Sequence, residues 1–178
     1  DDHASLLESG AVRLKRTRHG YMSYLISDRY IGRSFDRYGE FSEGEIELFR
    51  QLVRPGWLAV DGGANIGAHT LPLSALVGPT GAVIAAEPQR IIHQLLCANL
   101  ALNAVTNVRA MHTALGAEPG QITIPSIDYD AEGNFGGLAL GEHIETPREH
   151  PPAPLPDGNG IFGRPRRGAV IEQLKLQR

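Results

Sequence analysis

The sequence predicts an α/β fold built on a doubly wound parallel sheet. Short apolar runs bounded by turn residues, typical of strands buried on both faces, alternate with segments of helical periodicity between residues 57 and 112. The order is strand, helix, strand, helix, strand, and right-handed crossovers convert it into half of a doubly wound sheet. A length of 178 residues, 42% of them apolar, is enough for one globular domain with its own core.

The chain before the sheet is expected to form strands and then a helix. Apolar and polar residues alternate through 11–41, which indicates one or two strands. Ser42 precedes Glu45 by three residues, the spacing of a capping box in which each side chain satisfies a free backbone N–H. A helix should therefore begin at Glu43, and the breaker sequence at 54–56 should end it.

The elements of the predicted sheet follow in regular order. They are a strand at 57–61, a Gly-rich bend at 62–67, a helix that starts no earlier than residue 65 and closes at 78, a strand at 82–86, a helix from 87 to about 103, and a strand at 107–112. Pro72 is expected near the start of the first of these helices, because a first turn does not need the missing N–H.

The last part of the chain differs in composition. Residues 120–141 predict a hairpin or irregular strands. Six of the 12 prolines lie between Pro147 and Pro165, which indicates a flexible segment with one short element at 169–176. The expected division is an N-terminal extension at 1–41, a ligand-binding α/β domain at 42–145, and a Pro- and Arg-rich flexible tail at 146–178.

Charge and cysteine content argue against several functional classes. With 17 basic and 20 acidic residues, the chain lacks the basic excess of a general phosphate-backbone binder, so nucleic acid is not an expected partner. Cys97 is the only cysteine, so no intramolecular disulfide can form, and a cytoplasmic location is expected. The uncharged runs at 62–86 and 91–108 are interrupted by polar residues, so neither is expected to span a membrane.

The Gly-rich bend and two acids form the candidate ligand site. Asp61 ends the strand before the bend, and Glu87 follows the next strand. Such a bend presents backbone N–H groups and a helix N-terminus to a ligand, while an acid after the next strand accepts hydrogen bonds from ribose hydroxyls. The layout predicts a nucleotide or nucleoside site, for which a dinucleotide and S-adenosylmethionine compete.

Asp61 favours S-adenosylmethionine. A carboxylate about 4 Å from a phosphate charge would repel it by roughly 4 kcal/mol at an effective dielectric constant near 20, whereas it attracts the ammonium of a methionine tail. The bend fits G-x-G-x-x-G only with Ala64 in place of the second glycine, and Asn65 tolerates a left-handed backbone. The candidate cofactor-binding residues are Asp61, Gly62, Gly63, Ala64, Asn65, Ile66, Gly67, Glu87 and Pro88.

These residues carry a resemblance to a known family. The string Val60-Asp61-Gly62-Gly63-Ala64-Asn65-Ile66-Gly67-Ala68-His69-Thr70-Leu71 resembles the first motif of the FkbM-type methyltransferases, a branch of the class I S-adenosylmethionine-dependent enzymes. Further matches run in the family's order within residues 20–141. They are Tyr38-Gly39-Glu40-Phe41 with Glu45, Pro55-Gly56, Glu87-Pro88, Asn99-Leu100-Ala101-Leu102-Asn103, Ala114-Leu115-Gly116 and Asn134-Phe135-Gly136-Gly137.

The resemblance implies a fold, a reaction and a further contact. The fold would be Rossmann-like, of the class I methyltransferase type, and the reaction O-methylation of a hydroxyl on a sugar or secondary metabolite. The acceptor would be a small molecule or a glycan. By its place in the matched motif, Glu40 is a candidate contact of the methionine tail, and a plain surface position is equally open.

The sequence also departs from the family. The next strand of the family, usually Lys-Ile-Asp-x-Glu-Gly, has no counterpart after Leu140, so an incomplete sheet is expected. In the class I strand order, the first strand then keeps an unpaired edge that the tail or a second subunit would cover.

Two alternatives to the methyltransferase therefore stay open. The first is a noncatalytic nucleoside-binding remnant of the fold, and the second, less favoured, is an NAD-dependent oxidoreductase. Asp128, Asn134 and His69 are conceivable bases, and none is assigned. No metal site is expected, because no histidine has a second ligand at metal spacing.

Overall fold

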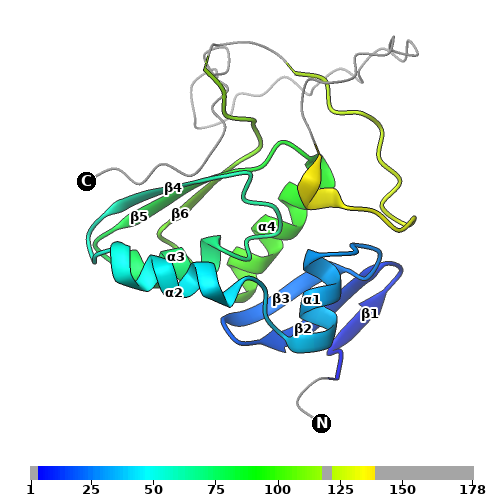
Figure 1. Cartoon of the computed structure of the whole chain (residues 1–178), viewed down its shortest axis with the longest axis horizontal. Helices are drawn as coiled ribbons and strands as arrows, with labels where there is room; N and C mark the ends of the chain where they lie inside the picture. The colour runs from blue at the N-terminus through cyan, green and yellow to red at the C-terminus, as the bar shows by residue number, and fades with distance from the viewer. Residues whose placement is uncertain (1–3, 118–121, 139–178) are drawn as a thin grey trace.

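The computed structural model of the chain describes residues 4–117 and 122–138. These residues form two three-stranded sheets connected and flanked by helices (Figure 1). The predicted tail at 146–178, its short element at 169–176, and the domain boundary at 145 lie outside the described residues.

The N-terminal extension forms an antiparallel sheet and a helix. Its strands β1 (Leu7–Ser9), β2 (Val12–Thr17) and β3 (Gly20–Leu25) lie in that order, followed by helix α1 (Ile31–Tyr38). The expectation of strands alone at 11–41 is therefore wrong for 31–38. Ile31, Gly32 and Phe35 are all buried, and the neighbours Ile31 and Gly32 can share one buried face only in a helix, because neighbouring residues of a strand point to opposite faces.

Helix α2 (Glu43–Leu52) begins at the predicted residue but without the predicted cap. Ser42 has a left-handed backbone with φ 55°, and its side chain accepts no backbone N–H of the helix. Its hydroxyl donates instead to the Glu45 carboxylate. The capping-box prediction is thus wrong in its hydrogen bonds, because the left-handed Ser42 backbone replaces the extended backbone that a side-chain cap needs.

The second sheet is parallel and confirms the predicted strand–helix alternation. Its elements are β4 (Leu58–Gly62), α3 (Thr70–Val77), β5 (Ala82–Ala86), α4 (Arg90–Leu102) and β6 (Val108–Met111). The strand order is β4-β5-β6, with Asp61 opposite Ala85 and Gly62 opposite Ala86. Pro72 is the third residue of α3, inside the first turn where its missing N–H has no intrahelical partner to lose.

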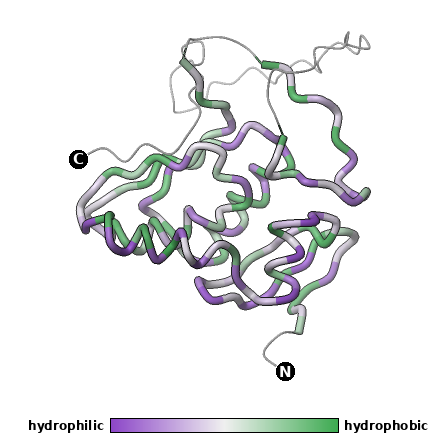
Figure 2. Tube along the Cα trace, viewed as in Figure 1, coloured by the Kyte–Doolittle hydropathy of each residue, from purple (hydrophilic) through white to green (hydrophobic). Residues whose placement is uncertain are grey.

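One face of the parallel sheet is packed, and the other is half-exposed within the described residues. Ala59, Val83 and Ala85 are at most 1% exposed and pack against side chains of α2, α3 and α4. Val60 and Ile84, which alternate with them along β4 and β5, are only partly buried. The expectation of strands buried on both faces therefore holds for one face only. Figure 2 shows apolar colour along β5 and the first part of β4, whose residues 82–86 and 58–60, respectively, are all apolar.

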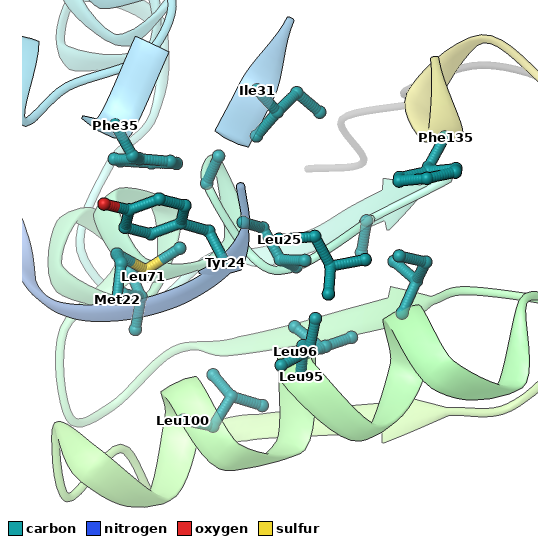
Figure 3. Close-up of a cluster of buried hydrophobic side chains, with 14 of the residues drawn as sticks. Met22, Tyr24, Leu25, Ile31, Phe35, Leu71, Leu95, Leu96, Leu100 and Phe135 are labelled. Carbon is teal, nitrogen blue, oxygen red and sulfur yellow. The ribbon is translucent and has the colours of Figure 1, made fainter. Parts of the chain in front are cut away.

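The larger core joins the extension to the parallel sheet. Met22 and Tyr24 of β3 and Phe35 of α1 lie in one buried cluster with Leu96 of α4 (Figure 3). Each of these side chains is at most 4% exposed. Burial at roughly 25 cal/mol per Å² of apolar surface makes this shared core the main stabilising contact between the two sheets.

Residues 122–138 fold back without forming the predicted hairpin. Their only regular features are an isolated bridge between Gly133 and Asp28 and a 3₁₀ helix, η1 (Phe135–Gly137). Phe135 is 3% exposed and belongs to the larger core. The expectation of a hairpin is wrong for these residues, because Phe135 anchors the segment to the core instead of to a partner strand.

Candidate functional site

Asp61 and Glu87 lie at the carboxyl ends of neighbouring parallel strands, where the sequence places them. Asp61 is the last residue but one of β4, and Glu87 directly follows β5. Parallel strands bring their carboxyl ends to one edge of a sheet, and ligands of open α/β sheets bind outside that edge. The two acids are 4% and 2% exposed, respectively.

Among the described residues, one side-chain donor holds the Asp61 carboxylate. The Thr70 hydroxyl, in the first turn of α3, donates to Asp61 Oδ2 over 2.5 Å. Burial raises the pKa of Asp61, and the Thr70 hydrogen bond and the His69 imidazole lower it in part. Between the described residues, no lysine or arginine forms an ion pair with Asp61 or with Glu87.

The Glu87 carboxylate ties the bend to the start of α4. Its Oε2 accepts the backbone N–H of Asn65 over 2.9 Å, and its Oε1 accepts that of Gln89 over 2.8 Å. Burial raises the pKa of Glu87, these two N–H groups lower it, and the negative charge of Asp61 raises it further. The two acids therefore form a buried pair of like charge.

The bend does not present its backbone N–H groups in the way that the sequence predicts. Those of Gly63 and Ala64 donate to the carbonyl of Ala86 over 2.9 and 3.0 Å, respectively. The next three donate to Glu87, to the Asn65 side chain and to the Ala64 carbonyl. Every N–H from residue 63 to residue 67 thus has an acceptor within the chain, which corrects the expectation of a cradle of free donors.

The bend has the left-handed backbone that its composition predicts. Gly63, Asn65 and Gly67 have φ values of 76°, 49° and 93°. A Cβ on Gly67 would lie 2.9 Å from Leu96 Cδ1, so a glycine is required there for α4 to approach. Gly63 is exposed and Gly62 half-buried, whereas Ala64, Asn65, Ile66 and Gly67 are buried.

Within the part of the chain that the structure describes, no hydrogen bond or ion pair joins Glu40 to the bend. Its carboxylate pairs with Arg18 at 2.6 Å. The neighbouring Phe41 instead packs toward the site, with its ring 5.9 Å from that of His69. Of the two readings left open for Glu40, its contacts favour the surface position.

The three conceivable bases are occupied elsewhere. The His69 ring lies between Phe41 and Phe49, with Nε2 3.2 Å from a Glu45 carboxylate oxygen but not aligned for a hydrogen bond. Asp128 and Asn134 are exposed and accept backbone N–H groups of their own turns. None is thereby placed as a base.

A cavity of about 410 Å³ opens at Pro88, the residue after Glu87. It is lined by Pro88, Arg90, Ile91, His112, Ile124, Pro125, Ser126, Ile127 and Tyr129. His112, just past the end of β6, donates from Nε2 to the Pro88 carbonyl over 2.9 Å. The cavity therefore lies at the same sheet edge as the two acids, and its walls combine apolar side chains with polar ones such as Arg90, His112 and Ser126.

The structure adds two polar residues that sequence reasoning misses. Gln89 is 4% exposed; its Nε2 donates to the Phe135 carbonyl and its Oε1 accepts from the Tyr129 hydroxyl, which fastens 122–138 over the sheet edge. Asn99 is fully buried and donates to the Ile66 carbonyl at the bend and to the Ser23 carbonyl in β3. Asn99 lies in the matched Asn99–Asn103 string, which was the only available signal.

Among solved structures, the chain is similar to methyltransferases. TYW2 of M. jannaschii in complex with AdoMet is 19% identical, with a TM-score of 0.48 and 62% of this chain covered against 49% of that one. For an O-methyltransferase of Thermotoga maritima, the identity is 17%, the TM-score 0.40 and the coverage 64% against 49%. Trm5b of Pyrococcus abyssi is 17% identical, with a TM-score of 0.45, and the match covers 58% of this chain and 28% of that one.

The chain spans no more than half the length of these structures. No protein-family model and no curated protein matches it. Within the described residues, no helix is long and apolar enough to cross a membrane, and no group of three or more His, Cys, Asp or Glu residues is arranged to hold a metal ion.

Proposed function

We propose that the chain binds S-adenosylmethionine at the bend between β4 and α3 and belongs to a methyltransferase. The observation that carries this proposal is the buried pair Asp61 and Glu87, which has no lysine or arginine partner among the described residues. Two uncompensated carboxylates at one sheet edge are costly unless a ligand brings positive charge. S-adenosylmethionine brings an ammonium and a sulfonium.

The hydrogen bonds of the bend support this ligand over a dinucleotide. A pyrophosphate needs free backbone N–H groups at a Gly-rich bend. The N–H groups from residue 63 to residue 67 are already used within the chain. Asp61 would in addition repel the phosphates. The NAD-dependent alternative is disfavoured on both counts.

The residues at the edge suit the parts of the proposed cofactor. Asp61 would hold the ammonium. Each Glu87 oxygen accepts one N–H and keeps a second lone pair for a ribose hydroxyl. The cavity next to Pro88, walled by Ile91 and Ile127, would take the flat adenine base. When bound, the cofactor supplies a methyl group on a positively charged sulfur, poised for transfer to a nucleophile.

The acceptor proposed from the FkbM resemblance is a hydroxyl of a sugar or secondary metabolite. Transfer to a hydroxyl needs correct positioning of the reactants and a base that takes the proton. Membership of the FkbM branch, the division at residues 41 and 145, and the cytoplasmic location belong to this same proposal.

A noncatalytic nucleoside-binding module is the second candidate. It is favoured by one observation, namely that His69, Asp128 and Asn134 all lie in contacts that do not point to a reacting hydroxyl. Such a module would bind S-adenosylmethionine without methyl transfer to any acceptor, which separates it from the enzyme.

Calorimetric titration of the full chain with S-adenosylmethionine and with NAD tests the proposal. We expect S-adenosylmethionine to bind and NAD not to bind. Asp61→Asn keeps the shape of the side chain and removes its charge, so it should weaken binding about tenfold or more. The matched control Glu47→Gln, at an exposed acid of α2, should bind as the unaltered chain does. Binding of NAD alone would refute the assignment.

A further inference from the structure

We propose that the outer face of α1 binds a single-stranded nucleic acid. Exposed residues along α1 and just before it make up what is here called the α1 strip: Arg29, Tyr30, Arg33, Arg37 and Tyr38. Residues 30, 33 and 37 recur at the three- and four-residue spacing of one helix face. From Tyr30 to Tyr38 the strip is about 12 Å long at the rise of an α-helix.

The fold concentrates positive charge that the whole chain does not show. Residues 4–41 carry seven lysines and arginines against four acids, whereas the full chain has a net charge of −3. The expectation that nucleic acid is not a partner rests on the whole-chain balance. Phosphate binding depends instead on the local density of cations on one face, and the α1 strip supplies three arginines within nine residues.

The arginines of the strip are weakly held. Arg37 forms no ion pair with any residue that the structure describes. Arg29 and Arg33 share one partner, the Glu132 carboxylate, at 3.2 and 3.9 Å. The Glu132 side chain is 61% exposed, so these pairs are solvent-screened and exchangeable. Glu132 thus occupies the place that a phosphate would take.

The tyrosines favour single strands over duplexes. Tyr30 and Tyr38 are 61% and 66% exposed, at the two ends of the strip. An exposed ring can stack on a base only where that base is not already stacked in a helix. In single-strand binding, arginines contact the phosphates and aromatic rings stack on the bases, and the strip offers both kinds of side chain.

A membrane surface fits this face less well. An interfacial helix inserts an apolar face between lipid headgroups. The apolar face of α1, with Ile31 and Phe35, is buried in the protein core, and the strip contains no exposed aliphatic side chain. Only charge would act on a membrane, so lipid binding is an alternative that the experiment distinguishes.

The strip adjoins the candidate cofactor site. A Cβ on Gly136 of η1 would meet Ile31 Cδ1 at 3.0 Å and Asn65 Nδ2 at 3.5 Å, so α1 and the bend approach the same residue. Glu132, four residues before Gly136, pairs with Arg29 and Arg33, so the strip begins beside the same segment. Binding to the strip is independent of the proposed function; only a role of the bound strand as methyl acceptor rests on it.

Fluorescence anisotropy with a labelled mixed-sequence 20-nucleotide RNA, and with DNA of the same sequence, tests the proposal on the full chain without cofactor. We expect Arg37→Gln to weaken binding about threefold or more, and Glu132→Gln to strengthen it about threefold by freeing Arg29 and Arg33. The double variant Tyr30→Ala, Tyr38→Ala should weaken binding at least about fivefold. Arg50→Gln, at an exposed arginine of α2 that pairs with Glu47, is the control and should change nothing.

The salt dependence gives a second readout. A single-stranded ligand loses about 0.7 from the log–log slope for each phosphate contact removed, and Arg37→Gln should show that loss. The proposal is overturned if the chain and Glu132→Gln both fail to bind at low salt, or if binding occurs but no strip variant alters it. Tighter binding of duplex than of single strand, or of anionic phosphatidylserine vesicles with the same variant pattern, overturns it as well. Cofactor titrations run separately, so failure here does not affect the proposed function.

Discussion

The Glu87 carboxylate and the backbone N–H of Asn65 are 2.9 Å apart, so the acid after β5 fixes the bend that follows β4. The same carboxylate accepts the N–H of Gln89 with its other oxygen. A group proposed to bind a ribose is therefore also a structural tie between two loops. Its two roles use different lone pairs of the same oxygens.

Removing this tie should destabilise the chain. Glu87→Ala leaves the buried N–H groups of Asn65 and Gln89 without an acceptor, at about 1 kcal/mol or more each. We expect the free energy of unfolding to fall by about 2 kcal/mol in urea titrations. Glu87→Gln, which keeps one acceptor oxygen, should lose about half as much. Equal stability of all three proteins would contradict the structural role.

Asp61→Asn should have the opposite effect on stability. The Thr70 hydroxyl can donate to an amide oxygen as well as to a carboxylate, so the substitution removes a buried charge and keeps its hydrogen bond. We expect the unfolding free energy at pH 7 to rise by about 1 kcal/mol, or the Tm by about 2–4 °C, while S-adenosylmethionine binding weakens. A stabilised variant that still binds fully would argue against a ligand at Asp61.

The gain in unfolding free energy from Asp61→Asn should depend on pH. Burial raises the pKa of Asp61 above its ordinary 3.8 in the folded chain. The folded state then binds more protons than the unfolded state between the two pKa values, so stability falls as pH rises through that window. The gain should therefore be absent below about pH 4, where both states are protonated, and should grow as the pH rises through that window. Thermal unfolding of both proteins from pH 3.5 to pH 8 measures this difference.

Asn99 should be among the most sensitive polar positions. Its Oδ1 accepts the Ser23 N–H and hydroxyl, and its Nδ2 donates to the Ser23 and Ile66 carbonyls. Asn99→Ala should cost about 3 kcal/mol of unfolding free energy, because several buried groups lose their partners. The control Asn103→Ala, which breaks exposed hydrogen bonds to Tyr21, should cost about 1 kcal/mol or less. If the two variants lose similar amounts of unfolding free energy, the hydrogen bonds of Asn99 to Ser23 and Ile66 are not the main polar link between β3 and the bend.

Two glycines of the bend should respond differently to alanine. Both have positive φ, but a Cβ on Gly63 meets nothing within 4 Å, whereas one on Gly67 meets Leu96 at 2.9 Å. Gly63→Ala should cost only the backbone strain, about 1 kcal/mol. Gly67→Ala adds a steric conflict with α4 and should cost about 2 kcal/mol or more. Chemical unfolding curves of the two variants give the comparison directly.

The free edge of β4 should promote self-association. Within the described residues, β4 pairs only with β5, and Leu58 at its start is 41% exposed. Unpaired strand edges favour pairing between chains, and a lysine at the edge opposes it. Sedimentation at increasing concentration should show association, and Leu58→Lys should reduce it. An unchanged distribution would show that this edge is not the contact.

Much of the parallel sheet could be predicted because its signals are local. The strand at 82–86 and the helix start at Glu43 agree with the structure to the residue. Turn residues and apolar periodicity act within a few positions, so a single sequence contains them. The helix at 31–38 was missed because residues four apart, such as Ile31 and Phe35, also lie on one face of a strand, so an apolar pattern over eight residues fits both structures.

The candidate site likewise has features that local sequence patterns predict and features that they do not. The sequence by itself determined that two acids and a glycine bend would meet at the carboxyl ends of parallel strands, since strand register and strand direction follow from local pattern. Only the tertiary structure decided which lone pairs and N–H groups stay available, that Gln89 and Asn99 tie distant segments to the bend, and that arginines of α1 gather on one face. Those outcomes depend on contacts between residues that are tens of positions apart in the sequence. No local pattern of residues indicates which such residues will bury or hydrogen-bond one another.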